Sequence, residues 1–279
     1  MPLISVITAA YAPTADYLPA TADSVAALEL PAGWELEWLV QEDGDDPQLA
    51  EFFARIPFAR YDAAGRQYGV SIARNLALGR ASGVLMQALD QDDVLLPGAF
   101  TTLIPRFREH RIHWAIGQAD DLMPDGGRRA YPSRIPFGLM KAGRVNRWAA
   151  EAGGNWEVHG ACLMMRTASV RALGGWSGLP GDDEISLLAG LSEITDGWYD
   201  EALTWLYRQH PKQQHRTAAA QERSEACRRI CLQRARAVAA TGLRFPAAAA
   251  AGFEVAEGAV TVAAASKDTT LPEAARAAG

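Results

Sequence analysis

The stretch VLMQALDQDD, residues 84–93, is a short apolar run that ends in a cluster of carboxylates. Its length, its apolar character and the small residues before it predict a buried strand. Side chains at positions i and i+2 of extended backbone share a face, so Asp90 and Asp92 can converge on one point. Two carboxylates at the mouth of a sheet suit a hard divalent cation that keeps positions open for phosphate oxygens. The alternative is an acidic turn before a helix whose first position is Pro97.

Strand-like and helix-like runs alternate on both sides of this stretch. Strands are expected at residues 3–8, 36–40, 112–116, 158–165 and 202–207, and helices at 49–56, 70–80, 97–110, 167–173 and 185–191. This alternation predicts an α/β fold with a Rossmann-like, mostly parallel central sheet flanked by helices. Residues 125–154 scatter Gly, Pro, Arg and Trp without a period, and we expect an irregular excursion over the open end of the sheet.

The C-terminal part of the chain has a different pattern. Residues 221–240 predict an amphipathic helix with Cys227, Ile230, Cys231, Ala235 and Val238 on its apolar face. The other face carries Arg223, Arg228, Arg229 and Arg236, which we expect to be solvated; contact with lipid headgroups is the alternative. Beyond Pro246 the chain is rich in Ala, which indicates a loosely packed tail. We therefore expect two units, residues 1–217 and a helical extension with its tail, residues 218–279.

Composition excludes several classes of function. The formal net charge of −6 over 279 residues gives no reason to expect a nucleic-acid partner. Three cysteines are too few and odd in number for a disulfide framework, and they favour a reducing, cytoplasmic location. Cys227 and Cys231 lie one helical turn apart, but two buried thiols are favoured over a metal site. No apolar run approaches the ~20 residues of a transmembrane helix.

Four segments occur in an order that resembles the donor-binding half of the family-2 glycosyltransferases, which have the GT-A fold. These segments are PLISVITAAY (2–11), LVQEDG (39–44), GVSIARNLA (69–77) and ALDQDDVLLPGA (88–99). The resemblance continues through HGAC (159–162), LGGW (173–176) and GDDE (181–184), and it ends at YRQHP (207–211). It covers about residues 2–217, and each motif is weak when taken alone.

The resemblance implies a nucleoside-diphosphate sugar as donor. Asp43 would accept a hydrogen bond from a pyrimidine N3–H, which favours uracil or thymine, hence UDP or dTDP. Arg74 would approach the base or the diphosphate, and Asp90 the ribose. Asp92 would bind Mn²⁺ or Mg²⁺, while Asp93 would support this site or cap the next helix. The remaining residues that the resemblance implies for nucleotide binding are Ala9, Tyr11 and Gln91.

The resemblance also implies inversion at the anomeric carbon by in-line displacement, with an acidic residue as general base. The candidates are Asp182, Asp183 and Glu184; Asp183 is preferred, and the other two would support it, for example as a helix cap. Family members often carry an Arg at the end of this segment, where this chain has Ala189 and Gly190.

A later loop and one Trp complete the expected site. His210 is expected as a third metal ligand or, with Lys212, as a partner of phosphate oxygens. Trp156 and His159 are expected to contact the substrate, and Trp156 could stack on a sugar face. For each of these residues, a solvated loop or simple packing is the alternative.

Other classes fit less well. A sugar nucleotidyltransferase or a dinucleotide oxidoreductase needs a Gly-rich loop after the first strand, where this chain has Ala9-Ala10-Tyr11-Ala12-Pro13. The different-class alternative is a catalytically silent family member that binds a nucleotide or a partner. The transferred sugar, the acceptor, which is a hydroxyl or an amine, and the oligomeric state are not readable from the sequence. Peripheral contact with a membrane stays open.

Overall fold

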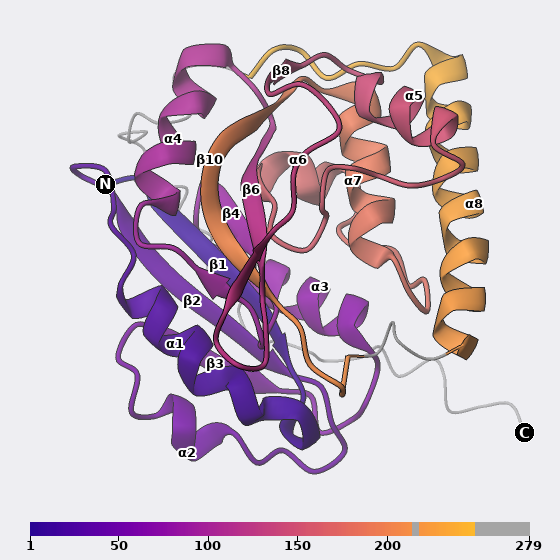
Figure 1. Ribbon diagram of the computed structural model, residues 1–279. Coiled ribbons are helices and arrows are strands. Elements are labelled where there is room, and N and C mark those ends of the chain that lie inside the picture. The colour runs from indigo at the N-terminus through magenta and orange to yellow at the C-terminus, as the bar shows by residue number, and fades with distance from the viewer. Residues whose placement is uncertain (214–217, 249–279) are drawn as a thin grey trace, which may run out of the picture.

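One ten-stranded sheet with helices on both faces forms the centre of the described residues, 1–213 and 218–248, of the computed structural model (Figure 1). The α/β fold class is therefore as predicted. The strands are β1 (Leu3–Ala10), β2 (Glu35–Glu42), β3 (Ala59–Ala63), β4 (Leu85–Ala88), β5 (Val94–Leu95), β6 (Trp114–Leu122), β7 (Arg128–Ala130), β8 (Gly138–Met140), β9 (Met164–Arg166) and β10 (Gly197–Arg208).

The strand order is β3-β2-β1-β4-β9-β6-β10-β5, with β7 paired to β6 and β8 to β10. The first four strands run parallel, and so do β6 and β10, whereas β9 joins the two groups in antiparallel pairing. Parallel strands end at the same edge of a sheet, and here Ala10 of β1 stands opposite Glu42 of β2. The loops that follow β1, β2 and β4 therefore meet at one edge, where ligands bind in open α/β sheets.

Two layers of helices cover the sheet. Ile4 and Val6 of β1 point to one face of the sheet. That face is covered by α1 (Leu18–Ala26), α2 (Ala50–Phe53) and α4 (Ala99–His110). The next side chain of the same strand, Ile7, points to the opposite face, as the two-residue period of a strand requires. That face is covered by α3 (Val70–Arg80), α5 (Arg144–Glu151), α6 (Thr167–Ala172) and α7 (Asp183–Ile194). A short 3-10 helix, η1 (Ala12–Tyr17), follows β1.

Several element boundaries differ from the prediction. Helix α3 has the predicted bounds, but α4 begins at Ala99 with Gly98 as its N-cap, so the expectation of a helix start at Pro97 was wrong. Of the predicted strand 158–165, only Met164 and Met165 lie in a strand, β9, which ends at Arg166. In the turn before it, Gly160 lies against Glu184, where a Cβ would stand 2.6 Å from the Cγ of that residue.

Residues 125–154 are not the irregular excursion that their composition indicated. They contain β7, β8 and α5. The two strands have three residues each and pair with β6 and β10, so tertiary pairing forms them rather than any local period. Strands β3 and β5 were missed for the same reason.

The C-terminal helix, α8 (Ala218–Thr241), lies along α7 at the outside of the molecule (Figure 1). Cys227, Cys231 and Ala235 face inward as predicted, whereas Ile230 is exposed, which corrects its place on the apolar face. The predicted boundary at residues 217 and 218 borders residues 214–217, which lie outside the described residues, as does the predicted tail from 249 onward. Among the helices of the described ranges, none has both the length and the apolar character that a membrane span requires.

Candidate active site

Asp43 follows β2 and ties this strand to the start of α3. Its carboxylate accepts hydrogen bonds from the backbone N–H of Tyr68, at 2.6 Å, and of Gly69, at 3.0 Å. Gly69 has φ +96°, a backbone conformation that glycine adopts without steric cost, and this lets the chain enter α3 beside the carboxylate. The predicted base-recognition residue therefore lies at the carboxyl edge of the sheet.

Arg74 of α3 connects the two halves of the predicted site. Its side chain is 3% exposed; Nη1 donates to Oδ2 of Asp183 at 2.8 Å, and Nη2 donates to Oδ1 of Asp90. The Glu184 carboxylate is 3.7 Å from Nη1. Burial alone would lower the pKa of Arg74, but the charges of Asp183, Asp90 and Glu184 outweigh it and raise that pKa, so the guanidinium is charged.

Asp183 and Glu184, at the start of α7, have pKa values that are moved apart. Burial and the neighbouring Asp183 charge raise the pKa of Glu184 well above its usual range. Burial also acts to raise the pKa of Asp183, but Arg74 and hydrogen bonds from Glu184 and Ser71 outweigh it and lower that pKa. These opposite shifts favour the negative charge on Asp183 over one on Glu184.

The loop after β4 gathers three carboxylates. Oxygen atoms of Asp90, Asp92 and Asp93 lie within 4.8 Å of one another. Oδ1 of Asp93 accepts the backbone N–H of Arg208 at 2.9 Å, while its Oδ2 is buried and has no hydrogen-bond partner within the described residues. Because α4 begins six residues later, Asp93 does not cap it, and that expectation was wrong.

These carboxylates fit a divalent cation. Burial and the charges of neighbouring carboxylates raise the pKa of both Asp90 and Asp93, and a bound cation would relieve that repulsion. Oxygen ligands of this kind suit Mg²⁺ or Mn²⁺. The buried oxygen of Asp93, which has no partner within the described residues, would offer such an ion an additional ligand atom.

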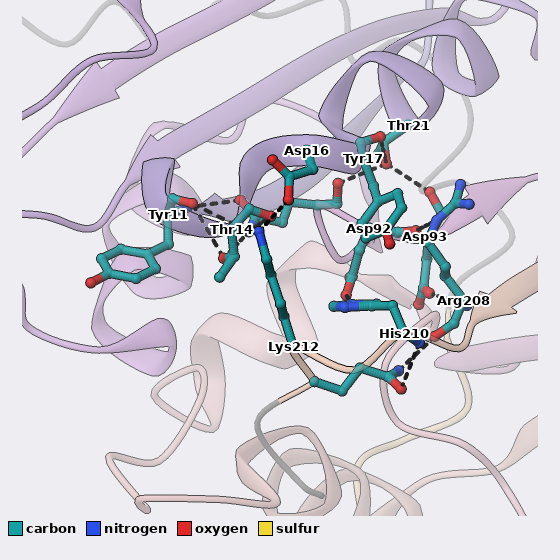
Figure 2. Close-up of polar contacts among 12 residues, drawn as sticks. Tyr11, Thr14, Asp16, Tyr17, Thr21, Asp92, Asp93, Arg208, His210 and Lys212 are labelled. Carbon is teal, nitrogen blue, oxygen red and sulfur yellow. Dashed lines mark hydrogen bonds and ion pairs between the residues drawn. The ribbon is translucent and has the colours of Figure 1, made fainter. Parts of the chain in front are cut away.

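His210 and Asp92, the two predicted metal ligands, are in contact. Nε2 of His210 lies 2.7 Å from Oδ2 of Asp92 (Figure 2). The imidazole stands 4.8 Å from the ring of Tyr17, which is also covered by the Arg208 guanidinium at 4.6 Å. Nε of Arg208 donates to the Asp92 carbonyl at 2.6 Å. No role for Arg208 or Tyr17 was predicted from the sequence, although Arg208 belongs to the same motif as His210.

The loop after β1 meets the carboxylate loop through Gln91. Its Oε1 accepts the backbone N–H of Tyr11 at 2.8 Å, and its Nε2 donates to Oγ1 of Thr14 at 2.8 Å. Ala9 is the next-to-last residue of β1, one position before this loop. The Lys212 ammonium pairs with Asp16 on an exposed surface nearby (Figure 2). The amide of Gln91 and the charge of Lys212 are thus used within the protein in the absence of a ligand.

Trp156 and His159 lie in the segment between α5 and β9. Trp156 is partly buried against Ile185 and Ala189 of α7 and α8's Cys231, and its Nε1 donates to Oδ1 of Asn146 at 3.0 Å. The His159 ring is 4.9 Å from that of Tyr207 in β10. Both residues therefore pack beside the elements that carry Asp183 and Arg208.

Asp182 has the N-cap position of α7, but its side chain makes no capping hydrogen bond. Its carboxylate instead accepts hydrogen bonds from Ser224 and Arg228 of α8. Arg228 was expected on the solvated face, and this contact corrects that expectation. A helical pattern identifies a charged face but not the partner that lies opposite it.

A mixed sheet whose carboxyl edge gathers acidic side chains, with one buried arginine between them, is an α/β architecture that places its ligand site at this edge. The family model described as glycosyl transferase family 2 matches residues 5–174, which is more than half of the chain. The chain belongs to this family, as the resemblance implied.

Solved structures with a similar fold include those of S. aureus TarS. TarS 1-349 in complex with UDP-GlcNAc has a TM-score of 0.63 at 15% identity, covering 83% of this chain and 70% of that one. TarS 1-349 alone has a TM-score of 0.59 at 16% identity, and this chain spans 60% of its length. Identity at this level shows the fold alone, and it confirms the predicted GT-A fold. The comparison with curated proteins found no match.

Proposed function

We propose that the chain transfers a sugar from a nucleoside-diphosphate sugar to an acceptor hydroxyl or amine, with inversion at the anomeric carbon. UDP or dTDP is the preferred nucleotide. The observation that carries the proposal is the convergence of Asp43, Arg74, Asp90 and Asp92 at one edge of the sheet, with Asp183 bonded to the same arginine. The TarS structures in complex with UDP-GlcNAc and with UDP support a uridine nucleotide on this fold.

The donor would lie across the loops that follow β1, β2 and β4. Asp43 keeps carboxylate lone pairs beside those that bind Tyr68 and Gly69, and these would accept the N3–H of uracil or thymine. Asp90 would bind ribose hydroxyls. Arg74 would then give up its hydrogen bond to Asp90 and donate to the donor, because the same guanidinium group would bind both.

Asp92 and His210 would hold Mn²⁺ or Mg²⁺, with Asp93 as a further oxygen ligand. When bound, such an ion offsets the charge that develops on the diphosphate leaving group. Arg208 keeps this part of the site in place, since its backbone N–H binds Asp93 and its guanidinium binds the Asp92 carbonyl.

Asp183 would take the proton of the acceptor as the bond to the sugar forms. It is ionised because Arg74, Ser71 and Glu184 stabilise its charge. Glu184, whose pKa is raised by burial and by the Asp183 charge, would keep Asp183 oriented through a hydrogen bond. Trp156, His159 and Lys212 are proposed as contacts for the acceptor or the sugar.

A titration with UDP and with dTDP, with and without Mn²⁺, tests the donor site. A panel of nucleotide sugars, scored by release of nucleoside diphosphate, then tests transfer or hydrolysis. We expect binding that requires the cation, followed by turnover of at least one donor. Absence of cation-dependent binding by both nucleotides would reject the donor-site assignment. Binding without turnover of any donor would favour a catalytically silent member of the family.

A further inference from the structure

Helix α8 lies outside the matched family segment, yet it contacts the loop that carries Asp183. The carboxylate of Asp182 is 11% exposed and accepts hydrogen bonds from Ser224 Oγ and, at 3.2 Å, from Arg228 Nε. The residue that precedes Asp183 is therefore held by α8.

The backbone at Asp182 needs this support. Its φ of +51° and ψ of +33° are left-handed, and among the described residues only Arg111 is another non-glycine with positive φ. A non-glycine residue in this region costs about 1–3 kcal/mol, and the conformation persists only where the surrounding structure holds it. The conformation turns the chain so that Asp182 points to α8 while Asp183 points to Arg74.

Arg228 also reaches a second loop. Its Nη1 donates to Oδ1 of Asn155 at 2.5 Å, next to Trp156. One guanidinium therefore joins the loop of the proposed base to the loop of a proposed substrate contact. One turn further along α7, Arg234 donates to the carbonyl and hydroxyl of Ser186 and fills the space above Gly190.

We propose that Arg228 is a positioning residue, which sets the direction of the Asp183 carboxylate by holding Asp182 and Asn155 in one geometry. This inference rests on the proposed role of Asp183. Arg228 itself touches no predicted donor residue. Its loss should therefore slow the chemical step without weakening the donor complex, because a misplaced base acts only in the transition state.

The test compares Arg228→Ala with Arg229→Ala, which removes an exposed arginine from the same helix. For Arg228→Ala we expect faster hydrogen exchange in peptides covering residues 179–190, and a kcat about 10- to 100-fold lower. We expect the donor KM to stay within about twofold. Arg228→Lys should restore little of the lost kcat, since an ammonium cannot donate to Asp182 and Asn155 together as the forked guanidinium does. Arg229→Ala should match the wild type.

A second variant separates positioning from a general loss of folding. Asp182→Asn keeps the size of the side chain, and together with Arg228→Ala it should add no further loss of kcat. Unchanged exchange in residues 179–190, or faster exchange with an unchanged kcat, would overturn the proposal. Exchange needs no donor, so it still decides the structural part if the wild type turns over no nucleotide sugar, a result that would reject only the proposed function.

Discussion

Nη1 of Arg74 and Oδ2 of Asp183 lie 2.8 Å apart although 109 positions separate them in the sequence. Both side chains are almost fully buried. The pair joins α3, which follows the proposed nucleotide loops, to α7, which begins with the proposed base. Folding and the site thus depend on the same ion pair.

Replacing Arg74 by Met should lower the free energy of unfolding by about 3–5 kcal/mol, because it leaves the buried Asp183 charge uncompensated. Urea unfolding measures the change. Arg66→Met is the control, since Arg66 is exposed, and it should change the stability by less than about 0.5 kcal/mol. A loss below about 1 kcal/mol for Arg74→Met would show that the pair contributes little. Adding Asp183→Asn should recover part of the loss.

The stability of the protein should fall in acid partly through His113. This residue is buried between Ser169 Oγ, at 2.8 Å, and the Pro246 carbonyl, at 3.1 Å. Burial lowers its pKa, with Arg166 acting in the same direction and the Pro246 carbonyl and Asp196 opposing. A folded-state pKa below the unfolded value of about 6.5 means a contribution that is complete above pH 6.5 and is lost as the pH falls through the folded pKa.

Denaturant unfolding of the wild type and His113→Gln at several pH values between 5 and 8 measures this contribution. The difference in free energy of unfolding between the two proteins should narrow as the pH falls from about 6.5. A difference that stays constant over this range would contradict the assignment. Groups elsewhere titrate in both proteins, so they cancel in the comparison.

The edge that carries the donor motifs could be predicted because strong local signals surround it. Long apolar runs identify β1, β2 and β4, and parallel strands bring their ends together, so Asp43, Asp90 and Asp92 fell at one edge. Helix α3 has its predicted bounds because local signals set both ends: Gly69 precedes its first residue, and the residues after Arg80 end it. The assigned roles of these residues stay predictions.

The remainder could not be predicted because it depends on partners that are distant in sequence. Strands β3, β5, β7 and β8 form by pairing with longer strands, and their own residues carry no clear period. Arg228 has the spacing of a solvated face, and only the position of α7 gives it Asp182 as a partner. The role of Arg208 could not be predicted for the same reason, since its partners Asp92 and Asp93 are distant in sequence.

Two glycines should respond in opposite ways to alanine. A Cβ at Gly197, at the start of β10, would overlap the buried indole ring of Trp114, whereas a Cβ at Gly79 in α3 would meet no described atom within 4 Å apart from its chain neighbours and the backbone of its own helix. Gly197→Ala should therefore destabilise by about 1–3 kcal/mol through overpacking. Gly79→Ala should stabilise by about 0.5–1 kcal/mol, because alanine favours a helix. Thermal unfolding checks both, and equal shifts would contradict the prediction.

Removing the cation or its main ligand should abolish turnover. Treatment with EDTA should stop release of nucleoside diphosphate, and Mn²⁺ or Mg²⁺ should restore it. Asp92→Asn should lower turnover by more than about 100-fold, since a bound cation is worth several kcal/mol of transition-state stabilisation. Glu29→Gln removes an exposed carboxylate elsewhere and should leave turnover unchanged. If turnover by Asp92→Asn still depends on Mn²⁺, residues other than Asp92 bind the ion.

Neutralising Asp183 and Glu184 one at a time should show which of them is the base and which supports it, because the two changes should lower kcat to different extents. Asp183→Asn removes the ionised carboxylate and should lower kcat by about 10²- to 10⁴-fold with little change in donor KM. Glu184→Gln keeps a hydrogen-bond donor to Asp183, so its kcat should fall by less than about tenfold. If Glu184→Gln proves the more damaging change, Glu184 is the base; its side chain is 26% exposed, against 4% for Asp183, and is therefore more accessible to an acceptor.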